Sequence, residues 1–207
     1  MSKKIIIVGS GNAALSAGIA SLEKGAEVTI YEKAEKKMAG GNTKYTAGAM
    51  RFAYESGDQL IDLLDNPKDV RLQKTDFGSY TQEKFKNDLL NFNDGRPLSW
   101  EQEILVSKSL DTIQWLSSHN VKFEPIYSRQ SFLKEGKHIF WGGLTLASEN
   151  EGVGLFNQEL SAFLSLGGKI FYKSPVTDLF FRDSAVKGVY IGDRKIESDA
   201  VILASGG

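Results

Sequence analysis

The sequence predicts an α/β fold with a central parallel sheet, and three observations carry this prediction. Short apolar, β-branched runs at residues 4–8 and 200–204 have the pattern of strands that are buried on both faces. After the first run, residues 15–22 place apolar side chains at helical spacing, and Gly25 stands where the helix would end. A further apolar run at residues 26–31 completes a strand–helix–strand unit, so its two strands should lie parallel.

The rest of the chain continues with helices and short strands. Apolar periodicity predicts helices at residues 54–64, 80–92, 99–119 and 154–166. Ser99 followed by Gln102 resembles a capping box, so the third of these helices should begin there. Strands are predicted at residues 169–172, 176–181, 186–191 and 195–196. Polar turns separate the last of these strands, which should form a small antiparallel meander.

These elements divide the chain into three segments. Residues 1–65 contain the strand–helix–strand unit, which is the pattern of a dinucleotide-binding fold, and a glycine-rich loop. Residues 66–150 change in character, and we expect a mainly helical insertion there. Residues 151–207 return to the first domain with the meander and a final strand.

Composition excludes several classes of function. The chain has 25 Lys and Arg against 26 Asp and Glu, so no overall field favours nucleic acid or an anionic membrane. It has no cysteine, which excludes disulfides, thiolate metal sites and iron–sulfur ligation. Its 2 histidines do not stand at metal-ligand spacing, so no metal is expected. The first apolar run is too short for a signal peptide or a membrane span, and a cytoplasmic location is predicted.

A glycine pattern follows the first strand. Gly9, Gly11 and Ala14 match the form of the G-x-G-x-x-G/A sequence that ends in alanine. Gly9 permits the tight turn, and Gly11 lets a diphosphate approach the backbone. The small Ala14, with Gly18, lets the helix pack closely on the sheet. Since the helix begins here, the backbone around Asn12 and Ala13 should offer N–H groups to the phosphates.

An acidic residue stands at the end of the second strand. Glu32 lies at about the spacing, roughly 20 residues on, at which a carboxylate accepts hydrogen bonds from ribose hydroxyls. Such a carboxylate disfavours a 2′-phosphate, and its neighbour Lys33 is a further expected cofactor contact. The sequence therefore predicts a dinucleotide site, although the glycine pattern leaves NAD and FAD equally open.

The next loop favours FAD. Gly40 and Gly41 allow backbone contact with phosphate, and the loop continues with the polar residues Asn42, Thr43 and Lys44. Gly48 and Ala49 would leave room for an isoalloxazine ring. A flexible glycine-rich loop that lies over the surface is the alternative interpretation of this segment.

The loop from Gly40 to Met50 resembles the flavin loop of the fumarate reductase and succinate dehydrogenase flavoprotein family, including its tricarballylate dehydrogenase-like branch. Residues 201–207, Val-Ile-Leu-Ala-Ser-Gly-Gly, resemble the later strand-to-glycine sequence of that family, in which threonine is commoner than Ser205. The resemblance implies a Rossmann-like FAD-binding fold. It also places the backbone of Val176 at the adenine, and Ala204, Ser205 and Gly206 beside the cofactor.

The resemblance also carries expectations about chemistry. Some family members attach FAD to a histidine in this loop, and Asn42 takes that place here, so we expect non-covalent FAD. The family transfers hydride between flavin N5 and a carbon beside a carboxylate, which implies a small carboxylate substrate. Its substrate cap and catalytic residues follow the strand-to-glycine sequence. We therefore expect this chain to be the N-terminal, FAD-binding part of such an oxidoreductase, inactive alone, with an unknown electron partner.

Two alternatives remain open from the sequence. The first is a non-catalytic nucleotide-binding module that a partner chain completes. The second is an NAD-linked Rossmann enzyme, against which the loop at residues 40–48 argues.

Overall fold

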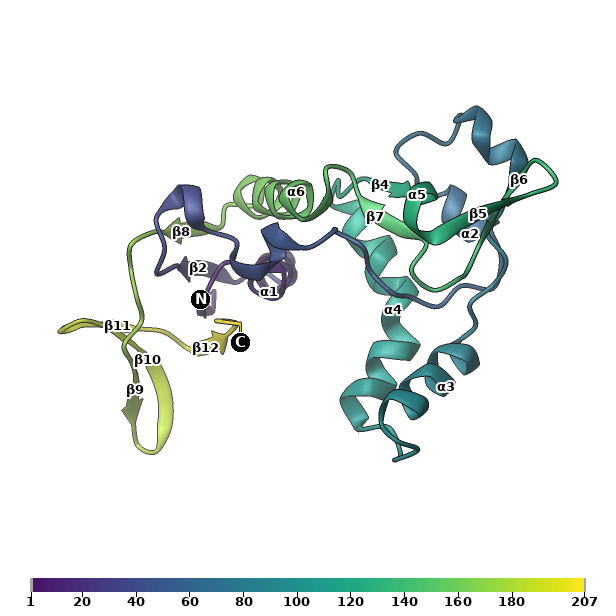
Figure 1. Cartoon of the computed structure of the whole chain (residues 1–207). Coiled ribbons are helices and arrows are strands. Elements are labelled where there is room, and N and C mark those ends of the chain that lie inside the picture. The colour runs from purple at the N-terminus through teal and green to yellow at the C-terminus, as the bar shows by residue number, and fades with distance from the viewer. Residues whose placement is uncertain (1, 207) are drawn as a thin grey trace. The chain divides into compact units, whose positions relative to one another are not determined.

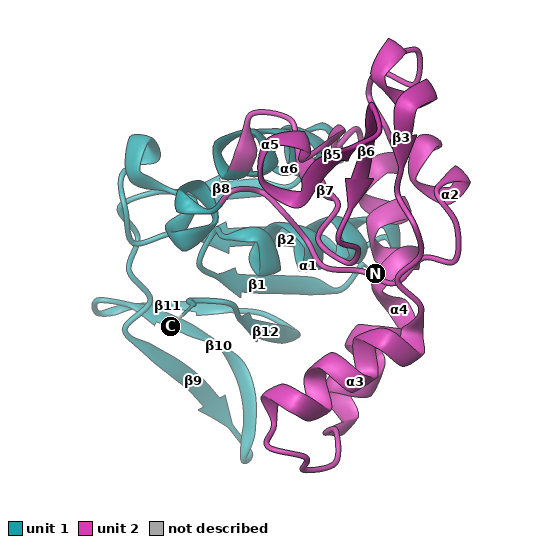
Figure 2. Ribbon diagram, turned by 45° about the vertical axis from the view of Figure 1, so that its right-hand side comes forward, with its two compact units in different colours: residues 1–46, 152–207 teal, residues 47–151 magenta. Residues whose placement is uncertain are grey.

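The computed structural model describes residues 2–206 (Figure 1). The chain divides into two compact units, shown in different colours in Figure 2. Unit 1 consists of the two terminal segments of the chain, Met1–Thr46 and Gly152–Gly207. Unit 2 is the segment between them, Ala47–Glu151. Gly207, the last residue of the predicted strand-to-glycine sequence, lies outside the described residues.

A parallel sheet forms the centre of unit 1. Its strands are β1 (Lys4–Val8), β2 (Glu27–Tyr31), β8 (Lys169–Phe171) and β12 (Ala200–Leu203). They lie in the order β12-β1-β2-β8, and every neighbouring pair is parallel. Ile6 and Ile7 of β1 are 3% and 0% exposed, as a strand covered on both faces requires. The predicted α/β class and the inner position of the first strand are confirmed.

Helices cover one face of this sheet. They are α1 (Asn12–Glu23) and α6 (Glu151–Ser165). A Cβ atom added to Gly18 of α1 would lie 2.7 Å from the ring of Phe163 on α6 and 3.5 Å from Ile7 of β1. Gly18 was expected to bring the helix close to the sheet, and it also lets α1 and α6 pack against each other.

The predicted meander covers the other face. Its strands β9 (Asp178–Arg182), β10 (Ala185–Ile191) and β11 (Arg194–Glu197) are antiparallel, in the order β11-β10-β9. Val189 of β10 forms a buried apolar cluster with Ile6 and Tyr31 of the parallel sheet. Because Ile6 and Ile7 are consecutive residues of one strand, their side chains point to opposite faces. The meander and α1 therefore lie on opposite sides of β1.

Unit 2 contains both helices and strands. The helices are α2 (Asp58–Ile61), α3 (Gln82–Phe92), α4 (Trp100–Ser118) and α5 (Tyr127–Gln130). The strands are β3 (Thr75–Asp76), β4 (Phe123–Pro125), β5 (Ser131–Lys134), β6 (Lys137–Phe140) and β7 (Leu146–Ser148). The predicted capping box of Ser99 and Gln102 is present at the start of α4, and His119 is the C-cap residue at its end. The helix predicted at residues 54–64 is reduced to α2, because Tyr54 pairs with Tyr80 instead.

The sequence did not predict the two small sheets of this unit. One has the order β3-β6-β5 and the other pairs β4 with β7. Each strand has only 2 to 4 residues, so alternation along the chain is too short to be recognised. The predicted insertion therefore contains two small sheets in addition to its helices.

The first boundary between the two units lies between Thr46 and Ala47, which is earlier than the predicted boundary after residue 65. The reason is long-range pairing, because isolated bridges join Ala49 to Ala147 and Leu64 to Phe123. Residues 47–65 thus belong to unit 2 through contacts that no local pattern indicates. The second observed division, between Glu151 and Gly152, lies one residue from the predicted boundary at 150/151.

Candidate functional site

The turn after β1 has the conformation that its glycines permit. Gly9 has φ +97°, in the left-handed region, and its N–H donates to Tyr31 O at 2.9 Å. A Cβ atom at this position would lie 2.4 Å from Ala204 O, at the end of β12. Glycine is therefore needed at residue 9 for its backbone angle and for the close approach of the strand-to-glycine segment.

The first turn of α1 exposes backbone donors. Asn12 N donates to Thr43 Oγ1 at 2.9 Å. Among residues 2–206, no acceptor receives a hydrogen bond from the amides of Gly11, Ala13 or Ala14. No acidic side chain lies in this turn to compete for them. Unpaired N–H groups and the positive end of the helix dipole make this turn suited to a diphosphate.

The side chain of Glu32 faces this turn. Its side chain is buried, and Ser10 Oγ donates to Glu32 Oε2 at 2.5 Å. Ala34 N donates to Oε1 at 2.8 Å. Burial, and then the charge of Glu32, raise the pKa of Tyr172, so Tyr172 lies within the field of this carboxylate. A carboxylate at the end of β2, beside the glycine turn, is suited to hydrogen bonds from a ribose.

Ser10 is a site residue that the sequence did not single out. Besides donating to Glu32, its hydroxyl accepts a hydrogen bond from Gly40 N at 3.1 Å. The side chain is 1% exposed. Ser10 therefore connects the first turn, the end of β2 and the glycine-rich loop, and no spacing pattern could have revealed it.

The loop Gly40–Lys44 lies against the first turn. It contains the 3₁₀ turn η2 (Gly41–Tyr45), and a shorter one, η1 (Lys36–Met38), precedes it. Thr43 binds Asn12, and Lys44 Nζ lies 5.1 Å from the centre of the Phe156 ring. Gly41 and Asn42 are exposed, and a Cβ atom on Gly41 would meet nothing within 4 Å. The inner side of the loop is thus held in place, while its outer side remains open.

Gly152 was also missed. A Cβ atom there would lie 2.0 Å from Thr43 O and 2.7 Å from Thr46 O, and Gly152 N donates to Thr46 O at 3.1 Å. The start of α6 therefore packs closely against the loop and donates a hydrogen bond to it. The helix predicted at residues 154–166 begins after Gly152, so the sequence gave no signal for this residue.

A buried acid lies under the first turn of α1. Glu159 of α6 is 0% exposed, and Ser16 Oγ donates to its Oε1 at 2.8 Å. Burial raises the pKa of Glu159 to about 8, and the hydrogen bond from Ser16 opposes this rise. The sequence offered one indication that Glu159 is buried, because it stands between Leu155 and Phe163 on the apolar face of the helix.

The remaining predicted residues of unit 1 lie at its edges. Ser205 and Gly206 are exposed after β12, and Lys33 is exposed after Glu32. Val176 is half-buried, and its side chain packs against the cluster around Val189. This packing is compatible with the backbone contact that the family resemblance implies for Val176.

Gly48 and Ala49 belong to unit 2. Gly48 has φ +64°, and a Cβ atom there would lie 2.3 Å from Ser148 Oγ and 2.6 Å from the carbonyl carbon of Glu151. Ala49 forms a bridge with Ala147. We expected glycine at residue 48 to make room for a flavin ring, but close packing within unit 2 already explains it.

The residues of unit 1 fit a dinucleotide cofactor. The free amides of the α1 turn suit a diphosphate, the carboxylate of Glu32 suits a ribose, and the open side of Gly41 leaves space for a ligand. Within residues 2–206, no three His, Cys, Asp or Glu side chains are grouped as a metal site would require. None of the helices in this part of the chain has both the length and the apolar character of a membrane span.

Comparison with known proteins agrees with this geometry. Residues 4–207 match the protein family described as FAD binding domain. A fumarate reductase (cytochrome) of Shewanella frigidimarina is 26% identical over 208 residues, which are 98% of this chain and 33% of the relative. An L-aspartate oxidase of Pyrococcus furiosus is 26% identical over 204 residues, 99% of this chain and 37% of that one. The chain spans about a third of the length of these curated relatives.

Solved structures show the same fold. The open conformation of a flavocytochrome c3 fumarate reductase matches with a TM-score of 0.69 and 23% identity, over 100% of this chain and 34% of that chain. A 3-ketosteroid delta1-dehydrogenase from Sterolibacterium denitrificans matches with a TM-score of 0.73 and 12% identity, over 100% of this chain and 48% of that chain. The resemblance to the flavoproteins of fumarate reductases is confirmed, and the family match favours FAD over the NAD alternative. The chain belongs to the FAD binding domain family, and its cofactor is FAD.

Proposed function

We propose that this chain provides the FAD-binding part of an oxidoreductase that transfers hydride at a carbon next to a carboxylate. The observation that carries the proposal is the pairing of free amides at the start of α1 with a buried carboxylate at the end of β2. The first group suits a diphosphate and the second a ribose.

The relatives support FAD binding more strongly than any one substrate. Proteins named fumarate reductase, L-aspartate oxidase and vinyl phenol reductase match nearly the whole chain at 26% identity. Their names refer to chemically different substrates, so the shared stretch is best understood as the part that holds the cofactor. A small carboxylate substrate, of the fumarate, succinate or tricarballylate type, is the finer proposal, and the first of these relatives supports it.

The roles of the chain's own residues follow from their contacts. Bound FAD would supply the hydride acceptor or donor. The α1 turn would bind its diphosphate, and Glu32, positioned by Ser10, would orient its ribose. Thr43 and Gly40 hold the glycine-rich loop against that turn, so the loop would close over the phosphates. We assign no catalytic residue to this chain, and we propose that residues of a longer protein bind and protonate the substrate.

The mode of cofactor attachment and the cellular location of the protein are further parts of the proposal. Asn42 takes the place of the histidine to which related flavins are attached, so FAD should be released when the protein is denatured with acid. A cytoplasmic location and an unidentified electron partner complete the proposed setting.

A charge placed in the first turn of α1 tests the proposal. Ala13 is exposed there, and Ala13→Asp would put a carboxylate beside the expected diphosphate. A negative charge at a helix N-terminus stabilises the helix, so the variant should fold at least as well as the wild type. We expect FAD affinity, measured by quenching of flavin fluorescence, to fall by about tenfold or more.

Ser184→Asp is the matched control, because it adds the same charge in the exposed turn between β9 and β10. Its FAD affinity should stay within about twofold of wild type. If Ala13→Asp and the wild type bind FAD with equal affinity, the diphosphate does not bind at this turn. Absence of FAD binding by the wild-type chain, with retention on a purified second polypeptide, would favour a module that a partner chain completes.

A further inference from the structure

A surface cavity of unit 2 has no role in the function proposed above. Its volume is about 330 Å³, at the lower end of the range of small-molecule sites. Its lining comes from the start of α2, from residues between 72 and 78, and from β6, all of which belong to unit 2 (Figure 2). The residues described above for the dinucleotide belong to unit 1, so a ligand of this cavity would be distinct from FAD.

Apolar side chains form one part of the lining. Phe77 is 4% exposed, and Ile61 and Leu72 are half-buried. The centre of the Phe77 ring lies 5.0 Å from that of the buried Phe140, so the core holds this ring in place. A fixed apolar wall of this kind suits a small hydrocarbon side chain.

Charged side chains of both signs form another part of the lining. β3 and β6 are parallel, and Asp76 is the partner of Ile139. Lys137 stands two residues before Ile139, so Lys137 and Asp76 project from the same face of this sheet. Strand spacing and rise put their Cα atoms about 8 Å apart. Asp58, at the start of α2, adds a second carboxylate to the cavity.

These opposite charges line one cavity but do not pair. Among residues 2–206, Asp58, Asp76 and Lys137 form no ion pair with each other or with any other side chain. Asp76 Oδ1 accepts a hydrogen bond from Gly78 N at 2.8 Å, which leaves its second oxygen open. Every arginine of unit 2, by contrast, pairs with an acid. Separated charges of opposite sign leave room for a ligand that carries the two complementary charges.

Another cavity of unit 2 lacks this arrangement. Its volume is about 160 Å³, half that of the first. Arg71 in its lining already pairs with Asp69, and Asp65 pairs with Lys122. The positive charge in this lining is thus already neutralised by the protein, so it offers no free partner to an anionic group.

We propose that the larger cavity binds a free α-amino acid with an apolar side chain. The carboxylate of such a ligand suits Lys137, and its ammonium group suits Asp58 and Asp76. The side chain suits the apolar wall described above. Two carboxylates against one lysine give the lining an excess of negative charge, which disfavours a carboxylic acid without an ammonium group. The inference goes beyond the proposed function and does not depend on the FAD site.

Ligands that each lack one group test the inference on the wild-type chain. NMR titration at neutral pH should give L-leucine a dissociation constant of about 1 mM or lower. 4-Methylpentanoate has the same carbon skeleton without the ammonium group, and 3-methylbutylamine lacks the carboxylate. Each should bind at least about fivefold more weakly, because one charged group of the cavity then has no partner.

Variants of the lining locate the site. Lys137→Gln should weaken L-leucine binding by about tenfold, and Asp58→Asn by about fivefold, since Asp76 remains. Lys134→Gln is the matched control, because Lys134 is exposed on the neighbouring strand β5 but lies outside the cavity. It should bind L-leucine within about twofold of wild type. All three side chains are exposed, so circular dichroism and FAD affinity should match those of the wild type.

The outcomes separate this inference from the proposed function. It is overturned if L-leucine at about 10 mM does not bind the wild type, or if 4-methylpentanoate binds as well as L-leucine. An equal loss in Lys134→Gln and Lys137→Gln would also overturn it, because the ligand would then lie outside this cavity. A chain that binds L-leucine as expected but not FAD would support this inference and contradict the proposed function. A chain that binds FAD but not L-leucine would do the reverse.

Discussion

The two units bury polar groups of different kinds. In unit 1 the buried polar side chains include the carboxyls of Glu32 and Glu159, both beside the first turn of α1. Among the described residues of unit 2, the buried polar side chains are hydroxyls, Ser109, Thr145 and Ser148. Burial of a carboxyl is far more unfavourable than burial of a hydroxyl. Unit 1 therefore carries groups whose presence is explained by a ligand site, while the polar groups of unit 2 support its packing.

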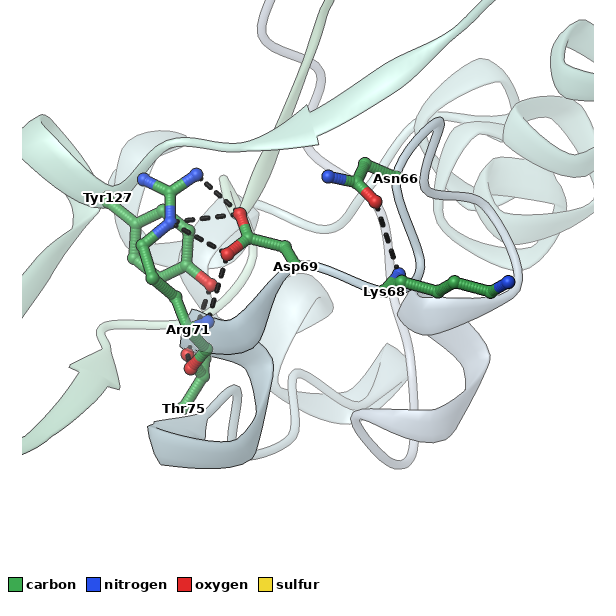
Figure 3. Close-up of polar contacts among 6 residues, drawn as sticks. All are labelled: Asn66, Lys68, Asp69, Arg71, Thr75 and Tyr127. Carbon is green, nitrogen blue, oxygen red and sulfur yellow. Dashed lines mark hydrogen bonds and ion pairs between the residues drawn. The ribbon is translucent and has the colours of Figure 1, made fainter.

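The charged residues of unit 2 lie at its surface, as the cluster in Figure 3 illustrates. Arg71 forms an ion pair with Asp69, and its guanidinium lies 4.3 Å from the centre of the Tyr127 ring. Tyr127 OH also lies 3.1 Å from Thr75 Oγ1. The hydrogen bond from Arg71 lowers the pKa of Asp69. These contacts shape an exposed turn, η3 (Val70–Lys74), rather than a buried site.

The largest effect of a single substitution at one pH is expected in the core of unit 2. Phe123 is 1% exposed, and Phe123→Ala should lower the free energy of unfolding by about 4 kcal/mol, through lost burial and the cavity that remains. Urea unfolding followed by circular dichroism measures this. Phe92→Ala is the control, because Phe92 is 84% exposed and should change stability by less than about 0.5 kcal/mol. Similar losses in both variants would contradict the assignment of the core.

The second effect concerns the glycine turn of unit 1. Gly9→Ala should destabilise the protein by about 3 kcal/mol, since it combines a left-handed backbone with a contact of 2.4 Å to Ala204 O. Gly25→Ala has a similar φ of +79° but meets nothing within 4 Å, so it should lose only about 1 kcal/mol. Thermal unfolding of the pair separates backbone strain from close packing. Equal losses would mean that β12 does not approach the turn as described.

The third effect is a pH dependence specific to unit 1. The folded pKa of Glu159 is raised from 4.5 to about 8, so its contribution to stability is complete below pH 4.5 and is lost as pH rises to 8. Wild type should lose up to about 1.4 kcal/mol per pH unit in this window relative to Glu159→Gln. Above pH 8 the difference should become constant. A difference that does not vary with pH would show that Glu159 ionises normally in the folded protein.

The smallest effect is expected at the surface of unit 2. Arg71→Ala removes an exposed ion pair and a contact with Tyr127, and it should lower stability by no more than about 1 kcal/mol. Because an exposed pair is screened, part of this loss should disappear in 1 M salt. Urea unfolding at low and high salt measures it. A loss as large as that of Phe123→Ala would contradict the exposed position of this ion pair.

The sequence by itself determined the elements that depend on neighbouring residues. The apolar run of β1, the capping box of α4 and the glycine turn with Glu32 all follow from patterns within a few turns or one strand–helix–strand unit. Such patterns set local conformation and burial directly, which is why they could be interpreted without a structure.

Only the tertiary structure decided what depends on residues far apart in the chain. Residues 47–65 belong to unit 2 because they pair with strands much later in the sequence. Ser10 acquires its role from Glu32 and Gly40, and Glu159 accepts a hydrogen bond from Ser16, which lies 143 residues earlier. A side chain's partner across such a distance is set by packing of whole elements, and no spacing in the sequence records it.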